Sequence, residues 1–133
     1  MNLISQTSEA GVGVCRLIYV VDDERLLLDL ARYLLEAEGF EVKTFRDPSQ
    51  ALQAYRRARR KPGLILTDYQ MRSMNGLELT SAFRRLTPDV KVALLSGSVD
   101  SAVYETASDQ PDRFLSKPYG QRELVQMVHD LLD

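Results

Sequence analysis

Short apolar runs alternate along the chain with segments whose apolar residues recur at helical spacing. The run from Leu17 to Val21 is rich in β-branched residues, which predicts a buried strand. In the segment that follows, the apolar residues lie three and four positions apart, which predicts an amphipathic helix. The residues that we expect on its buried face are Leu27, Leu30, Ala31, Leu34 and Leu35.

Turn and cap residues mark the ends of the first two helices. Asp22 or Asp23 can cap the start of the first helix, and Gly39 supplies its C-terminal stop. Asp47-Pro48 is a strong start for the second helix, with Asp at the N-cap and Pro at the first helical position. We expect this second helix to run to about Arg60.

The pairing of strand and helix recurs to the end of the chain. Further strands are expected at Phe40–Phe45, Leu64–Thr67, Val90–Leu95 and Arg113–Ser116, and further helices at Gly76–Leu86, Ser101–Ser108 and Gly120–Leu132. Five such units imply right-handed crossovers and a parallel sheet between two layers of helices. The predicted fold class is therefore α/β, a doubly wound (βα)5 domain.

The composition fits one globular domain. At 44% hydrophobic and 27% charged residues, we expect a single folded unit over residues 15–133 after a flexible N-terminal tail of residues 1–14. A net charge of −2 gives no overall field that favours nucleic acid or an anionic membrane. The single cysteine, Cys15, cannot form an internal disulfide. Without a signal-peptide pattern or a run of the ~20 apolar residues that span a membrane, we expect a cytoplasmic protein.

Four of the predicted strands end at polar side chains. Asp22 and Asp23 follow the first strand, Asp68 the third, Ser96 the fourth and Lys117 the fifth. The carboxyl ends of parallel strands meet at one edge of the sheet, where ligands of such folds bind. Three carboxylates that converge there repel one another unless a cation lies among them, and Mg²⁺ favours such oxygen ligands.

This set of residues suits phosphoryl transfer. A carboxylate can act as a nucleophile and become an aspartyl phosphate. The transfer depends on positioning and charge neutralisation, which Mg²⁺, Lys117 and Ser96 would supply. Each residue alone has an ordinary explanation, since an Asp after a strand is often a helix cap and Ser-Gly or Lys-Pro is often a turn. Their common placement at strand ends indicates a site.

In these motifs the sequence resembles the receiver domain of two-component response regulators, from Leu17 to Leu132. The resemblance implies a flavodoxin-like fold whose five-stranded parallel sheet has the order 2-1-3-4-5. It implies that a sensor histidine kinase or a histidine phosphotransfer protein phosphorylates Asp68. It also implies that Mg²⁺ binds Asp23, Asp68 and the backbone carbonyl of Gln70 directly, and Asp22 through water.

The resemblance carries further expectations about the switch. Ser96 and Lys117 would contact the phosphoryl group, and Phe114 matches the position of an aromatic switch residue. The Lys117-Pro118 peptide bond is expected to be cis. The surface that changes would comprise the fourth helix, fifth strand and fifth helix, through which a partner or a second copy would bind. One departure from the family is Arg72, where a proline is frequent.

Two other functions fit parts of the sequence. A phosphohydrolase with an aspartyl-phosphate intermediate would need a second acid two residues after the nucleophile, but Gln70 stands there, and no cap insertion is present. A phosphorylation-independent interaction module would not need the complete set of strand-end residues. We therefore expect no enzyme activity beyond the domain's own phosphorylation and dephosphorylation.

The remaining charged features favour ordinary roles. The basic run from Arg56 to Lys61 lies near a helix C-terminus, which favours a solvated face over nucleic-acid binding. His129 is expected at the surface rather than as a phosphoacceptor. Because the chain ends with the last predicted helix, we expect a single-domain regulator or a receiver that is part of a longer protein, such as a hybrid kinase.

Overall fold

The computed structural model describes residues 16–97 and 109–133. Three predictions lie outside these residues: the N-terminal tail of residues 1–14, the position of Cys15, and the helix at Ser101–Ser108.

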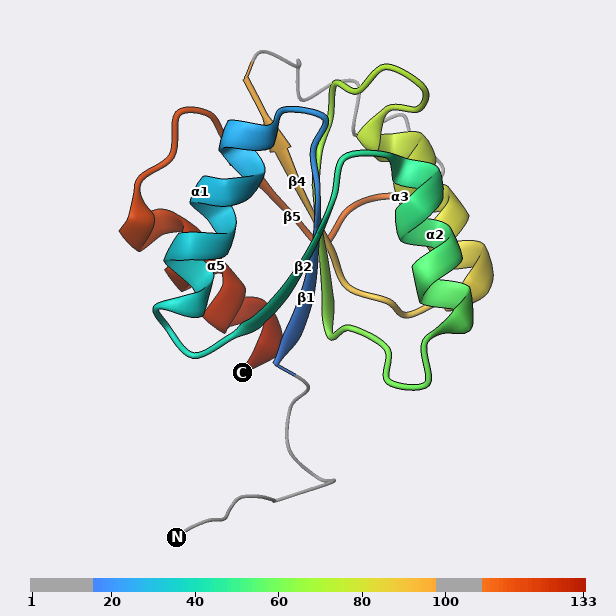
Figure 1. The fold of residues 1–133 in the computed structure, drawn as a ribbon, viewed down its shortest axis with the longest axis horizontal. Helices are drawn as coiled ribbons and strands as arrows, with labels where there is room; N and C mark the ends of the chain where they lie inside the picture. The colour runs from blue at the N-terminus through green and yellow to red at the C-terminus, as the bar shows by residue number, and fades with distance from the viewer. Residues whose placement is uncertain (1–15, 98–108) are drawn as a thin grey trace, which may run out of the picture.

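Five strands and four helices are described, and they alternate along the chain (Figure 1). The elements are β1 (Leu17–Val21), α1 (Arg25–Glu36), β2 (Glu41–Phe45), α2 (Pro48–Arg57), β3 (Leu64–Asp68), α3 (Gly76–Leu86), β4 (Val92–Ser96), β5 (Arg113–Ser116) and α5 (Gln121–Leu132).

All five strands are parallel, in the order β2-β1-β3-β4-β5, as predicted. Helices α1 and α5 cover one face of the sheet, and α2 and α3 cover the other (Figure 1). Because side chains alternate along a strand, β1 contributes residues to the hydrophobic cores on both faces of the sheet. Ile18 and Val20 pack in the core with α1 and α5, whereas Tyr19 and Val21 pack with α2 and α3. The doubly wound α/β prediction is confirmed.

The helix starts agree with the sequence at α2 but not at α1. The Asp47 side chain accepts a hydrogen bond from the Ser49 N–H at 3.0 Å, with Pro48 first in the helix. At α1 the N-cap is Glu24, without a side-chain cap, so the expectation that Asp22 or Asp23 caps this helix is wrong. Both acids precede the helix, because the chain runs on past the end of β1 before it turns.

Two details of the predicted helices are also wrong. Ala31, Leu34 and Leu35 are buried in α1 as expected, but Leu30 is 45% exposed, and Leu28, which was not expected on the buried face, is 3% exposed. Helix α2 ends at Arg57 rather than near Arg60. The chain turns back after it, and the Lys61 ammonium lies 4.7 Å from the centre of the Tyr55 ring.

Candidate functional site

Three carboxylates gather at the carboxyl ends of β1 and β3. The two strands pair with Val21 beside Thr67, so Asp22 and Asp68 follow on adjacent strands. Asp22, Asp23 and Asp68 each place a carboxylate oxygen within 4.8 Å of the others. Asp22 is 3% exposed and Asp68 7% exposed. The fold thus brings together all three acids that the sequence placed at strand ends.

Lys117 reaches these acids from the loop after β5. Its Nζ donates a hydrogen bond to Asp68 Oδ1 at 2.9 Å and lies 3.5 Å from Asp22 Oδ2. Its backbone N–H donates to the Ser96 carbonyl at 2.7 Å, which holds the loop against the end of β4. The Lys117-Pro118 peptide bond is cis, as predicted. One ammonium therefore contacts two of the three carboxylates.

Burial and charge shift the pKa values of these groups. Burial raises the pKa of Asp22 to about 6, and repulsion from Asp68 and Asp23 also raises it. The hydrogen bond from the Glu24 N–H and the attraction to Lys117 lower it. Burial also raises the pKa of Asp68, although its hydrogen bond from Lys117 opposes this. Burial disfavours the Lys117 ammonium, but its bond to Asp68 and its attraction to both acids raise its pKa overall. The cluster retains excess negative charge.

A hollow of about 230 Å³ opens beside Asp68 and Lys117. The residues that line it are Glu24, Asp68, Gln70, Ser96, Gly97 and Lys117. Ser96 is 3% exposed at the end of β4, next to Ser116 of β5. Ser96 and Gln70, which the sequence singled out, therefore border the same space as Asp68. Phe114, on β5, is 39% exposed and is not part of this lining.

Three residues near the site were not singled out by sequence. Glu24 lines the hollow, and its signal was a third acid directly after Asp22-Asp23. Burial raises the pKa of Tyr119. The charges of Asp22 and Asp68 also raise it, whereas Lys117 lowers it. Gly76 starts α3 so close to β3 that a Cβ atom there would lie 2.6 Å from the Asp68 carbonyl oxygen. The need for glycine at position 76 arises from this close approach, which the sequence does not show.

The donor set fits a small divalent cation. Three carboxylate oxygens lie within 4.8 Å of one another, and one ammonium does not neutralise them. Mg²⁺ takes oxygen ligands and commonly binds through one or two carboxylates while it retains water. The residues present therefore fit the ion that the sequence predicted.

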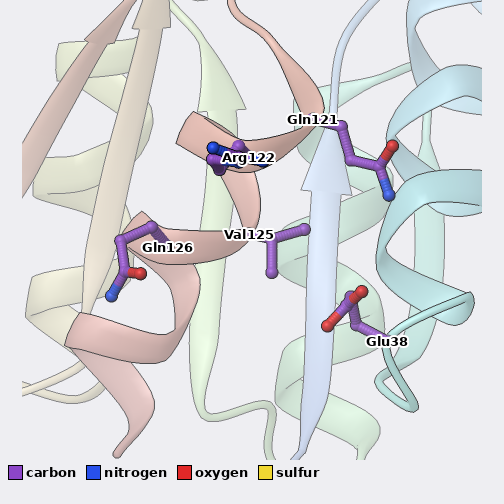
Figure 2. Close-up of a pocket in the computed structure, with 5 residues that line it drawn as sticks. All are labelled: Glu38, Gln121, Arg122, Val125 and Gln126. Carbon is purple, nitrogen blue, oxygen red and sulfur yellow. The ribbon is translucent and has the colours of Figure 1, made fainter.

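Another hollow, of about 440 Å³, lies away from the acids, between the turn after α1 and the first half of α5. Figure 2 shows its lining, which consists of Glu38, Gln121, Arg122, Val125 and Gln126. It has greater volume than the hollow at Asp68 but contains none of the strand-end residues. The smaller hollow beside Asp68 is therefore the candidate site.

Comparison with known proteins gives one consistent result. The family model for the response regulator receiver domain matches residues 18–129. The DNA-binding response regulator MtrA of Mycolicibacterium smegmatis is 33% identical over 112 residues, which are 84% of this chain and 48% of MtrA. The chain thus spans about half the length of this relative. No helix among residues 16–97 and 109–133 is long and apolar enough to cross a membrane.

Solved structures give the same picture. A response regulator receiver domain protein from Clostridium thermocellum matches with a TM-score of 0.80 and 25% identity, over 86% of this chain and 92% of that one. The response regulator TrrA of Thermotoga maritima, solved in complex with Mg²⁺-BeF, matches with a TM-score of 0.77 and 28% identity. That match covers 87% of this chain and 98% of TrrA.

Proposed function

The chain belongs to the response regulator receiver domain family of two-component signal transduction, and from this premise we propose that Asp68 is its phosphoacceptor. The observation that carries the proposal is the setting of the Asp68 carboxylate. It is almost buried, lies beside Asp22 and Asp23, and accepts a hydrogen bond from Lys117 at 2.9 Å. It also borders a hollow through which a donor can reach it.

The chemistry follows from these neighbours. An Asp68 oxygen attacks the phosphorus of the donor, and the bond to the leaving group breaks with its electron pair. Lys117 holds one phosphoryl oxygen as its ammonium, whose raised pKa keeps it charged. Ser96 borders the same hollow, and we assign its hydroxyl the role of donating to another phosphoryl oxygen. The domain thereby acts only on itself, and receiver domains in general are not enzymes in the usual sense.

Receiver domains generally bind Mg²⁺ at an acidic cluster, and we assign that role here to Asp22, Asp23 and Asp68 with the Gln70 carbonyl. Bound there, the ion would offset the negative charge of the acids and of the phosphoryl oxygens. In this proposal Asp23 and Asp68 would bind the ion directly, and Asp22 would act through water. The chain's own contribution is to fix these oxygens at the ends of two adjacent strands.

Receiver domains of response regulators interact with histidine kinases, and we propose that the donor is such a kinase or a histidine phosphotransfer protein. Phosphorylation would move Ser96 and Phe114, and this movement would change the surface formed by β5, α5 and the segment between β4 and β5. MtrA is described as DNA-binding, but the match covers 48% of it. We propose that this domain itself does not contact nucleic acid.

Phosphorylation by a small acyl phosphate tests the central assignment. Incubation with acetyl phosphate and Mg²⁺ should add one phosphoryl group to the intact mass, and removal of Mg²⁺ by a chelator should prevent this. Asp68→Asn should abolish the gain, whereas the matched variant Asp89→Asn, at an exposed turn, should keep it. A gain that persists in Asp68→Asn at full occupancy refutes the proposal.

Turnover separates this function from the phosphohydrolase alternative. The domain should take up one phosphoryl group and should not hydrolyse a generic phosphomonoester such as p-nitrophenyl phosphate repeatedly. Sustained release of the phenol that depends on Asp68 would favour the enzyme instead.

A further inference from the structure

An apolar stripe runs along the outer face of α1. Leu26, Leu30 and Tyr33 are 82%, 45% and 72% exposed. Their spacing of four and three residues places them on one side of the helix. Helix α1 lies at the outside of the molecule, against the sheet face that it shares with α5 (Figure 1). We call Leu26, Leu30 and Tyr33 the α1 stripe.

The α1 stripe continues into a hollow of about 310 Å³. This hollow is lined by Leu27, Leu30, Lys117, Pro118 and Tyr119, from α1 and from the loop before α5. Exposed apolar surface of this continuity marks an interaction site more often than single exposed leucines do. The Asp68 chemistry uses none of the three stripe residues.

The charges beside the stripe are self-complementary. Arg25 lies at the first position of α1 and Glu36 at its last. They are eleven residues apart, which places them on one side of the helix and at roughly 8 Å on either side of its midpoint near Leu30. If a second α1 packs antiparallel about a two-fold axis at Leu30, Arg25 of each copy meets Glu36 of the other.

The neighbouring charges obey the same symmetry. Asp29 and Arg32 also flank the midpoint, so the two-fold axis brings Asp29 of one copy to the height of Arg32 of the other. Within one copy the Arg32 guanidinium lies 3.8 Å from the Glu36 carboxylate and donates to the Val42 carbonyl. Leu26 then meets Tyr33, and Leu30 meets its own copy. A parallel pairing would instead place Arg25 against Arg25 and Glu36 against Glu36, which like-charge repulsion disfavours.

We propose that the α1 stripe is a homodimer interface, in which two copies of this chain pair through antiparallel α1 helices. The apolar stripe supplies the contact, and the Arg25 and Glu36 charges set its direction. One helix face buries less than the ~1,200 Å² of a standard interface, so the dimer is weak and transient.

Analytical ultracentrifugation of the full chain, up to about 1 mM, is the test, since weak dimers populate only at high concentration. The wild type should dimerise reversibly with rising concentration. Leu30→Ser should abolish the dimer, because it acts twice at the symmetry axis. Arg25→Glu and Glu36→Arg should each weaken association about tenfold, because each reverses two exposed pairs.

Two combinations make the test specific. The double variant Arg25→Glu/Glu36→Arg should regain wild-type association, since every cross pair is attractive again. A mixture of the two single variants should form a heterodimer, because positions 25 and 36 both carry acids in one variant and both carry bases in the other. Glu36→Arg removes the exposed ion pair that Glu36 makes with Arg32 at 3.8 Å, and such a pair contributes little stability. Both changes suit the helix dipole, with an acid in the first turn and a base in the last, so the fold should be kept. Circular dichroism checks that.

Three results overturn the proposal. One is a chain that stays monomeric at every concentration. Another is a dimer that Leu30→Ser leaves unchanged, which would place the interface on another surface. The third is a double variant that does not recover. If the chain is monomeric while Leu30→Ser slows phosphorylation by a kinase but not by acetyl phosphate, the stripe belongs to the phosphoryl donor instead.

Discussion

Replacement of Asp22 by Asn should stabilise the metal-free domain at neutral pH. Burial and repulsion raise the pKa of this acid to about 6 in the folded protein. Between pH about 4 and 6 the folded state therefore binds a proton that the unfolded state has released. Stability falls as pH rises through this range and stays low above it. Asn carries no charge and keeps an oxygen that can accept the Glu24 N–H bond.

The magnitude follows from the size of the shift. A rise from the ordinary value of 3.8 to about 6 corresponds to about 3 kcal/mol of lost stability above pH 6. The Asp22 side chain is 4% exposed, so solvent screens little of this effect. Asn also forfeits the attraction to Lys117 at 3.5 Å, which offsets part of the gain. We expect Asp22→Asn to gain up to about 3 kcal/mol at pH 7.5, and little at pH 4.

Urea unfolding followed by circular dichroism, in the presence of a chelator, measures the effect. Wild type, Asp22→Asn and the exposed control Asp89→Asn are compared at pH 4, 6 and 7.5. The stability advantage of Asp22→Asn should grow with pH. It should shrink when Mg²⁺ replaces the chelator, because Mg²⁺ binding stabilises the wild type, which retains all three acids, more than it stabilises the variant. An advantage that is absent at pH 7.5, or equal at all three pH values, would refute this electrostatic reasoning.

Three further predictions concern stability, each checked by urea unfolding. Gly76→Ala should cost about 1–3 kcal/mol, because its Cβ would lie 2.4 Å from Leu94 Cδ1; unchanged or higher stability would contradict the close approach. Asn75→Ala should cost about 1 kcal/mol, because it removes the capping box of α3, and an unaltered midpoint would count against this cap. Tyr55→Phe should also cost about 1 kcal/mol, by loss of its 2.6 Å hydrogen bond to Thr87; no change would mean that water replaces the bond.

Much of the fold could be predicted from sequence because the three central strands, β1, β3 and β4, are buried on both faces. Such strands are short continuous apolar runs, and β1 begins and ends where the sequence placed it. The edge strand β5 also has the predicted bounds, although it is largely exposed. Helix boundaries were less certain, since α2 ends early where Lys61 packs on Tyr55. The exposure of Leu30 was missed because a leucine-rich helix offers more than one apolar face.

The candidate site was predictable to the extent that topology alone assembles it. Strand ends in a parallel sheet bring Asp22, Asp68 and Lys117 to one edge, whatever lies between them. The order of the strands came from family resemblance rather than from periodicity. Sequence did not reveal that Asp22 is more buried than Asp68, or that Gly76 must pass close to the Asp68 carbonyl, because both depend on packing.

Mapping of the phosphorylated residue tests the central claim most directly. The domain is phosphorylated with acetyl phosphate and Mg²⁺, and borohydride then reduces the acyl phosphate of the modified aspartate to homoserine. Peptide sequencing by mass spectrometry locates that residue. The account predicts homoserine at position 68 alone, and none after treatment with a chelator in place of Mg²⁺. Homoserine at Asp22, Asp23 or any other acid, with Asp68 unmodified, would contradict it.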